Sequence, residues 1–181
     1  MKEYILEVKK LLTPSFCEKI ISYHDNNLEE AQIVSGINKN TRNCLTKHLH
    51  EPKSLGEKIL LNAIKEKIFD CVNVYKEKFF INITSLSQID FLKYETNDFD
   101  AGYKFHCDYG INSMQRHLSI SICLNNNYRG GEFVFQLPSS DQFVIPQNEG
   151  DALIFPSNFM FPHQVNKITS GTRYALIGWV Y

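Results

Sequence analysis

The first half of the chain repeats apolar residues at helical spacing in two segments. The first segment opens with Thr13, an expected N-cap, and Pro14 at the first helical position, and it ends near residue 26. The second opens with Ser54-x-x-Glu57, the pattern of a capping box. We expect its apolar stripe to pack against a sheet, and the stripe consists of Leu55, Ile59, Leu60, Ala63, Ile64, Ile68, Val72 and Tyr75.

From residue 81 the pattern changes to short runs of β-branched and aromatic residues, which predict strands. Turn signals separate the runs, among them Gly130-Gly131 and Pro138-Ser139-Ser140. The polar stretch 38–48, between the helices, is expected to be a loop or an edge strand. Eight short strands after two helices are typical of an antiparallel barrel or jelly roll with helices on one face. The eight runs are "SLSQIDFLKY", "KFHCDY", "HLSISICL", "GGEFVFQL", "DQFVIP", "DALIFP", "HQVNKI" and "TRYALIGWVY".

Composition and charge exclude several classes of protein. The chain has 181 residues, enough for one domain with its own core, and a formal net charge of −1. A near-neutral chain gives no electrostatic reason to expect nucleic acid or a membrane surface as partner. No apolar run approaches the roughly 18 residues of a spanning helix, and the charged N-terminus does not resemble a signal peptide. We therefore expect a cytoplasmic protein, or one of the host-cell cytoplasm if the source is viral.

The cysteines and several histidines carry no metal-binding pattern. The five cysteines form no C-x-x-C pair and are expected to be free thiols. Cys107 is expected to point away from its two neighbours, because successive residues of a strand face opposite sides. Surface or loop positions are expected for His24, His48, His50 and His117.

The stretch "YKFHCDYG" concentrates the candidate chemistry. A strand would place His106 and Asp108 on one face, and a buried carboxylate is costly unless it is paired or binds a metal. His163 is a candidate third ligand, and Arg173 follows it by ten residues. Two histidines and one carboxylate form the facial triad of non-haem Fe(II) oxygenases. The same three groups also suit zinc, which leaves a zinc hydrolase open.

These motifs together resemble a known family. The run "YKFHCDYG … RHLSISICLN … YRGGEFVF … GDALIFPSNFMFPHQVNKITSGTRYALIGW" is similar to 2-oxoglutarate- and Fe(II)-dependent dioxygenases of the prolyl 4-hydroxylase-like branch. The resemblance extends to "LLTPSFCEKIISYH" and "TRNCL", so it covers nearly the whole chain. It implies a single domain, 1–181, that is mainly β with N-terminal helices (α+β). A double-stranded β-helix (jelly roll, cupin-like) in residues 81–181 would be the catalytic core, with 1–80 as helical support.

The resemblance also implies roles for individual residues. His106, Asp108 and His163 would bind Fe(II), and Arg173 would pair with the distal carboxylate of 2-oxoglutarate. Further residues of the cosubstrate pocket would be Tyr94, Tyr103, Trp179 and Ser119, with Arg116 in an Arg-x-x-Ser element beside Ser119. Four phenylalanines are expected to be core residues or to line the pocket: Phe91, Phe105, Phe155 and Phe161.

The implied reaction is hydroxylation of a C–H bond, with 2-oxoglutarate converted to succinate and CO2 and O2 consumed. Ascorbate is a further cofactor that the resemblance suggests. We expect a prolyl residue of a protein or peptide as substrate, with residues 36–50 as a lid and Arg42 either at the surface or facing the substrate. A free amino acid or another small molecule is the alternative substrate.

Two further alternatives have less support in the residues. Nucleic-acid demethylases of this chemistry carry a second arginine where this chain has Trp179. A non-catalytic jelly-roll metal-binding module would be expected to have lost a ligand or the cosubstrate arginine, and this chain keeps all four residues.

Overall fold

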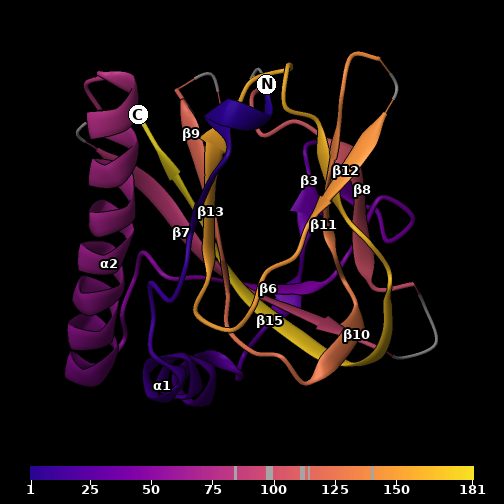
Figure 1. Cartoon of the computed structure of the whole chain (residues 1–181). Helices are drawn as coiled ribbons and strands as arrows, with labels where there is room; N and C mark the ends of the chain where they lie inside the picture. The colour runs from indigo at the N-terminus through magenta and orange to yellow at the C-terminus, as the bar shows by residue number, and fades with distance from the viewer. Residues whose placement is uncertain (84, 97–99, 111–112, 114, 140) are drawn as a thin grey trace.

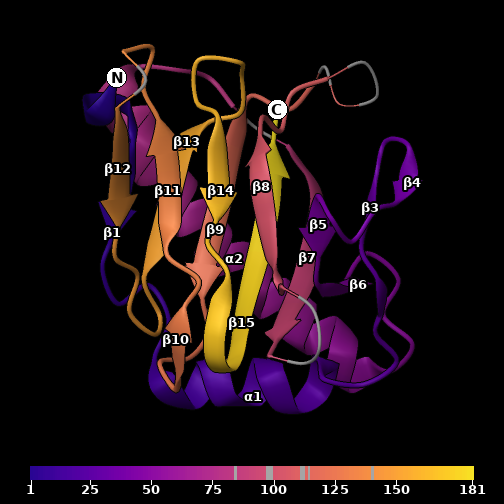
Figure 2. The same cartoon turned by 90° about the vertical axis from the view of Figure 1, so that its right-hand side faces the viewer.

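Two antiparallel sheets face each other and form the body of the protein (Figure 1). The structure is a computed structural model, and it describes residues 1–83, 85–96, 100–110, 113, 115–139 and 141–181. The large sheet has the strand order β1-β13-β9-β15-β7-β6-β2, with β10 paired to β15. The small sheet has the order β12-β11-β14-β8-β5. In Figure 2 the small sheet lies toward the viewer, and the hairpin β3–β4 stands beside it.

The elements have the following bounds. The large sheet consists of β1 (Leu6–Val8), β2 (Glu29–Glu30), β6 (Leu45–His48), β7 (Leu86–Glu95), β9 (Leu118–Cys123), β10 (Tyr128–Gly130), β13 (Ala152–Pro156) and β15 (Ile168–Val180). The small sheet consists of β5 (Arg42–Asn43), β8 (Gly102–His106), β11 (Phe133–Gln136), β12 (Gln142–Ile145) and β14 (His163–Val165). The remaining elements are the hairpin β3 (Gln32–Ile33) and β4 (Gly36–Ile37), the 3-10 helix η1 (Lys2–Tyr4), and the helices α1 (Pro14–His24) and α2 (Leu55–Phe79).

Both helices begin where the sequence predicts. The Thr13 hydroxyl caps α1 by accepting a hydrogen bond from the Phe16 amide at 3.3 Å. The Ser54 hydroxyl caps α2 by accepting from the Glu57 amide at 3.1 Å. The Glu57 carboxylate returns to the amide of Lys53 at 2.6 Å, one residue before the position that the capping-box pattern assigns to it.

The large sheet separates an apolar core from a cavity. Side chains of β9 alternate, so Ile120 and Ile122 pack toward α1 and α2 while Ser119 and Ser121 face the small sheet. Phe91 of β7 is fully buried on the helical side and belongs to that apolar core. A second core of aromatic and aliphatic residues fills the space between the two sheets. The helices therefore support one face of the large sheet and leave the other free for a site.

The predicted mainly β fold with two helices is confirmed, with differences in detail. Six short strands precede residue 50, and β1, β2, β5 and β6 join the two sheets, so the first half of the chain also contributes strands. The second half has nine strands in its described residues, because β10 forms at residues 128–130, where no separate strand was predicted. The predicted turn at Pro138-Ser139-Ser140 includes residue 140, which lies outside the described residues.

Three predicted positions are wrong. Leu55 and Ile59 are 74% and 61% exposed, because at 3.6 residues per turn they lie on the face of α2 opposite Ile64 and Ile68. His24, expected at the surface, is buried at the end of α1.

The described part of each helix is too polar or too short to cross a bilayer. All five cysteines are free thiols, as expected, and Cys107 is the one that is not buried.

Candidate functional site

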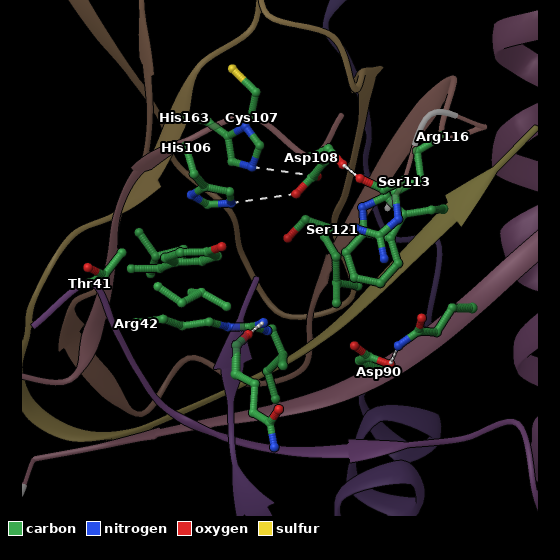
Figure 3. Close-up of a pocket in the computed structure, with 18 of the residues that line it drawn as sticks. Thr41, Arg42, Asp90, His106, Cys107, Asp108, Ser113, Arg116, Ser121 and His163 are labelled. Atoms are coloured by element: carbon green, nitrogen blue, oxygen red, sulfur yellow. Dashed lines mark hydrogen bonds and ion pairs between the residues drawn. The ribbon is translucent and has the colours of Figure 1, made fainter. Parts of the chain in front are cut away.

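A cavity of about 610 Å³ lies between the two sheets and collects most of the predicted site residues (Figure 3). Its walls come from the inner faces of β7, β9 and β15 on one side and from β8, β11 and β14 on the other. Residues of the β3–β4 hairpin, Gln32 to Ser35, line its mouth. The cavity is therefore built from both halves of the chain.

A β-bulge in β8 directs two aromatic rings into the cavity. Val165 of β14 lies opposite Tyr103, and His163 lies opposite His106, so two steps along β14 correspond to three along β8. The extra residue resets the alternation, and both Tyr103 and His106 point inward. Their rings stack with centroids 3.4 Å apart and an interplanar angle of 16°. The bulge thus places a flat aromatic surface against one candidate ligand.

His163 lies directly across from His106, and both rings are oriented by backbone carbonyls. The Nδ1 of His106 donates to the Lys104 carbonyl at 2.8 Å, and the Nδ1 of His163 donates to the Phe161 carbonyl at 3.0 Å. Because Nδ1 carries the proton in both rings, each Nε2 presents a lone pair to the cavity. This is the form in which imidazole binds a metal ion.

Asp108 completes the group, though not by the predicted route. Strand β8 ends at His106, so Asp108 is placed by the loop that follows and not by strand alternation. Its Oδ2 accepts a hydrogen bond from the Ser119 hydroxyl at 2.6 Å, and its carbonyl accepts from the Ser113 hydroxyl at 2.9 Å. The expected proximity to His106 is present, because the loop is anchored at both its carboxylate and its backbone.

These three residues, called the ligand trio below, converge on one point. Nε2 of His106 lies 3.5 Å from Oδ1 of Asp108, and Nε2 of His163 lies 3.7 Å from Oδ2. All three ligand atoms lie within 4.8 Å of one another. Figure 3 shows the three side chains pointing toward a shared space, while the sulfur of Cys107 points away as expected. Two imidazole nitrogens and a carboxylate that converge on one space are a donor set that fits a divalent metal.

The ionisation of the trio favours the same conclusion. Burial lowers the pKa of His163 to about 4, so this imidazole is neutral at physiological pH. Burial acts to raise the pKa of Asp108, but His163, His106 and the Ser119 hydroxyl outweigh it and hold that pKa well below its usual range. His163 and Asp108 therefore present a neutral imidazole and a carboxylate, the protonation states that metal binding requires.

Arg173 lies in the same cavity as a buried cation that has no carboxylate partner among the described residues. It is 1% exposed, and its Nε forms no hydrogen bond in the part of the chain that the structure describes. Within the described part of the chain, its Nη2 donates one long hydrogen bond, 3.4 Å, to Gln147. Burying a guanidinium without a counter-ion costs on the order of several kcal/mol of folding free energy, as it does for any buried charge. The arrangement fits a ligand that carries a carboxylate, such as 2-oxoglutarate.

A glycine makes room for that arginine. A Cβ on Gly131 would lie 2.9 Å from the Arg173 Cδ and 2.4 Å from the Ile168 Cδ1. The residue also has φ +68°, which L side chains rarely adopt. The "GGE" segment, predicted to be only a turn, therefore also shapes the space around Arg173.

The other predicted pocket residues occupy different parts of the cavity. Tyr94 lies across from Arg173 in the sheet register, with the guanidinium 5.4 Å from its ring. The guanidinium of Arg116 lies over the ring of Trp179 at 3.7 Å. Ser119 contacts the Asp108 carboxylate and not the Arg173 end. Residues 97–99, in the loop after Tyr94, lie outside the described residues.

Arg42 lines the cavity. The sequence had allowed either a surface position or one facing the substrate. The Nη1 of Arg42 donates to the Gln32 carbonyl at 3.1 Å, and its guanidinium lies 4.9 Å from the centre of the Tyr103 ring. Much of the expected lid, residues 36–50, belongs to strands β4, β5 and β6 instead. The four phenylalanines predicted to be core or pocket lining are core or lie off the cavity, and among the described phenylalanines it is Phe133 that lines it.

Sequence reasoning missed a polar group on the cavity wall. Asp90 is 3% exposed, and its Oδ1 accepts from Nδ1 of His48 and Nε2 of Gln88, each at 2.7 Å. The signal was present, since Asp90 interrupts the apolar run "IDFL" at an even spacing from Tyr94. His48 was assigned to the surface and is half-exposed at the edge of the cavity.

Comparisons with known proteins agree with this geometry. Residues 89–181 match the model of the 2OG-Fe(II) oxygenase superfamily. A PKHD-type hydroxylase of Picosynechococcus sp. is 28% identical over 179 residues, which cover 96% of this chain and 76% of the relative. Among solved structures, a Pseudomonas putida prolyl-4-hydroxylase has TM-score 0.76 and 16% identity, covering 98% of this chain and 92% of its own. A Trichoplax adhaerens prolyl hydroxylase, solved with a hypoxia inducible factor peptide, has TM-score 0.76 and 18% identity, covering 98% and 83%.

Proposed function

Because the chain belongs to the 2OG-Fe(II) oxygenase superfamily, we propose that it hydroxylates a prolyl residue of a protein or peptide. Enzymes of this family use Fe(II), 2-oxoglutarate and O2. One observation carries the assignment of the site. Three ligand atoms within 4.8 Å of one another share a cavity with a buried arginine that has no carboxylate partner in the described residues.

We propose that the ligand trio holds the iron and that Arg173 holds 2-oxoglutarate. The fork of the guanidinium suits the distal carboxylate of the cosubstrate, and Tyr94 borders the same end of the cavity. The bound iron and cosubstrate supply the oxidation, in which one O2 converts C–H to C–OH while 2-oxoglutarate becomes succinate and CO2. The chain positions these reactants and restricts water: Ser119 orients Asp108, and Phe133 stacks on His163 at 5.1 Å.

The prolyl substrate is supported by proteins of similar fold and by an exposed apolar residue in the hairpin that lines the cavity. The relatives that match most of the chain include prolyl hydroxylases, and one with a similar fold was solved with a peptide. The hairpin β3–β4 presents Val34, which lines the cavity and is 88% exposed, and we propose that it covers a chain-like substrate. We also propose that residues 1–181 act as one domain, because strands from both halves form the cavity.

Anaerobic titration with Fe(II) and 2-oxoglutarate tests the cofactor assignment, because chelated 2-oxoglutarate gives a weak visible charge-transfer band. We expect the band in the wild type, its loss in Asp108→Ala, and a much higher 2-oxoglutarate requirement in Arg173→Ala. Asp70→Ala and Arg129→Ala, both at exposed residues, serve as matched controls that retain the wild-type band. A wild type that binds zinc tightly but gives no band would contradict the proposal.

The substrate is tested separately with O2 present. Proline-containing peptides and free proline are incubated with the loaded enzyme, and the products are analysed by mass spectrometry for the gain of one oxygen atom. Oxidation of peptides and not of free proline is the expected result. Oxidation of free proline alone would replace the peptide substrate with an amino acid and leave the cofactor assignment standing.

A further inference from the structure

The wall of the cavity beside His48 carries a buried carboxylate that the proposed chemistry does not use. Asp90 lies on the inner face of β7, with Leu92 and Tyr94 on the same face, and it lines the cavity (Figure 3). Its side chain is 4% exposed. It is not one of the groups placed around the metal or beside Arg173. A charged residue in this position needs a partner, because burial of an unpaired charge is strongly unfavourable.

The neighbours of Asp90 orient its carboxylate but leave one oxygen available. His48 and Gln88 both donate to Oδ1, each at 2.7 Å. No hydrogen bond from the described residues reaches Oδ2, and no lysine or arginine among them lies within ion-pair distance. The guanidinium of Arg116 lies 3.7 Å from the centre of the Trp179 ring, and within that same part of the chain it forms no ion pair with Asp90. Asp90 is therefore held in place with an acceptor facing the cavity.

The sheet register places Asp90 away from both the metal and the cosubstrate. Asp90 pairs with Ile177 of β15, and Ile177 pairs with Ser121 of β9, the strand whose Ser119 holds Asp108. Two strand spacings separate β7 from β9, which is about 10 Å. Arg173 lies opposite Tyr94, four residues along β7, or about 13 Å. An extended peptide advances about 3.5 Å per residue, so Asp90 is within reach of a side chain close to the reacting residue.

We propose that Asp90 is a specificity-determining residue that binds a basic side chain of the substrate, within about three residues of the hydroxylated proline. This inference rests on the proposed function. A lysine or arginine is the group that fits, because Oδ2 accepts no hydrogen bond from the described residues and none of their lysines or arginines pairs with this carboxylate, so a cationic donor gains a charge-assisted hydrogen bond there. His48 and Gln88 act through Asp90 as positioning residues.

The single tryptophan of the chain offers a binding signal that does not depend on turnover. Trp179 lies opposite Gln88 in the register, so its fluorescence reports occupancy of this end of the cavity. The protein is loaded with Fe(II) and 2-oxoglutarate without O2 and titrated with capped proline peptides. The peptides carry either lysine or norleucine at one, two or three residues on either side of proline, so the pairs differ mainly in charge.

We expect the lysine peptide to bind about tenfold more tightly than its norleucine partner at one of these positions, as for a charge-assisted hydrogen bond. Asp90→Asn should abolish this preference, and Asp90→Lys should shift it to the corresponding glutamate peptide. Asp70→Asn, on the exposed face of α2, should keep the wild-type preference.

Two results would overturn the inference: equal binding of lysine and norleucine peptides at every position in the wild type, or an unchanged preference in Asp90→Asn. The wild-type comparison needs no variant, so the test stands even if a variant fails to fold. The charge-transfer titration is run on the same samples. Absence of the charge-transfer band in the wild type would contradict the proposed function. A band without a preference for the lysine peptide would contradict only the role of Asp90.

Discussion

The two faces of the large sheet, made by the same strands, have opposite character. On the side of α1 and α2, Phe91, Ile120 and Leu176 are at most 1% exposed and contact other apolar groups. On the side of the small sheet, the same strands carry the polar or charged residues Asp90, Ser119 and Arg173. Hydrophobic burial on one face stabilises the strands. The other face can then hold buried polar and charged groups that would by themselves destabilise the fold.

The largest change in stability is expected from a substitution on the apolar face. Ile120→Ala removes a fully buried side chain between β9 and the helices and should lower the free energy of unfolding by about 2–5 kcal/mol. Chemical denaturation measures the loss. The charge-transfer titration of the folded protein should be unchanged, because Ile120 points away from the cavity. If the folded Ile120→Ala variant bound 2-oxoglutarate more weakly than the wild type, the two faces of the sheet would be coupled.

A smaller effect is expected from the one buried histidine on the helical side. Burial and the nearby Lys47 lower the pKa of His24 to about 4, against an ordinary value of 6.5. Above pH 6.5 both folded and unfolded chains carry a neutral ring, and His24 does not change stability with pH. Between pH 6.5 and 4 the unfolded chain takes up a proton that the folded protein resists, so stability falls as pH falls, by up to about 3 kcal/mol.

Chemical denaturation at several pH values measures this contribution as a difference between variants. His24→Leu should lose stability less steeply than the wild type on acidification, while His50→Gln, at an exposed histidine, should follow the wild type. The subtraction matters because burial lowers the pKa of His163 as well, and that contribution is common to all three proteins. Identical pH slopes for His24→Leu and the wild type would contradict the assignment.

The smallest effect is expected from a single hydroxyl on the polar face. Ser119→Ala removes the hydrogen bond to Oδ2 of Asp108 and should weaken metal affinity by about 10- to 100-fold. Competition with a chelator measures the change in metal affinity. Ser121→Ala, two residues along the same face, serves as the control, because no hydrogen bond joins its hydroxyl to the ligand trio in the described residues. Equal affinities for the two variants would show that Ser119 does not orient the carboxylate.

Much of the fold follows from local patterns in the sequence. Thr13 and Ser54 identify the helix starts because a capping side chain bonds to an amide only three residues away. The runs of β-branched residues identify the strands for an equally local reason. The expected stripe of α2 included Leu55 and Ile59 wrongly, because apolar character does not by itself indicate which face of a helix is covered. Asp90 was missed because its importance depends on the cavity it faces.

The sequence by itself determined the residue types of the site and their order along the chain: His106 and Asp108 together, then His163, then Arg173. Only the tertiary structure decided how they meet. The bulge in β8 turns His106 inward, the pairing of β8 with β14 brings His163 across from it, and the loop after β8 carries Asp108 between them. Helical and strand periods depend on neighbouring residues, whereas register and bulges are set by packing between segments far apart in the chain.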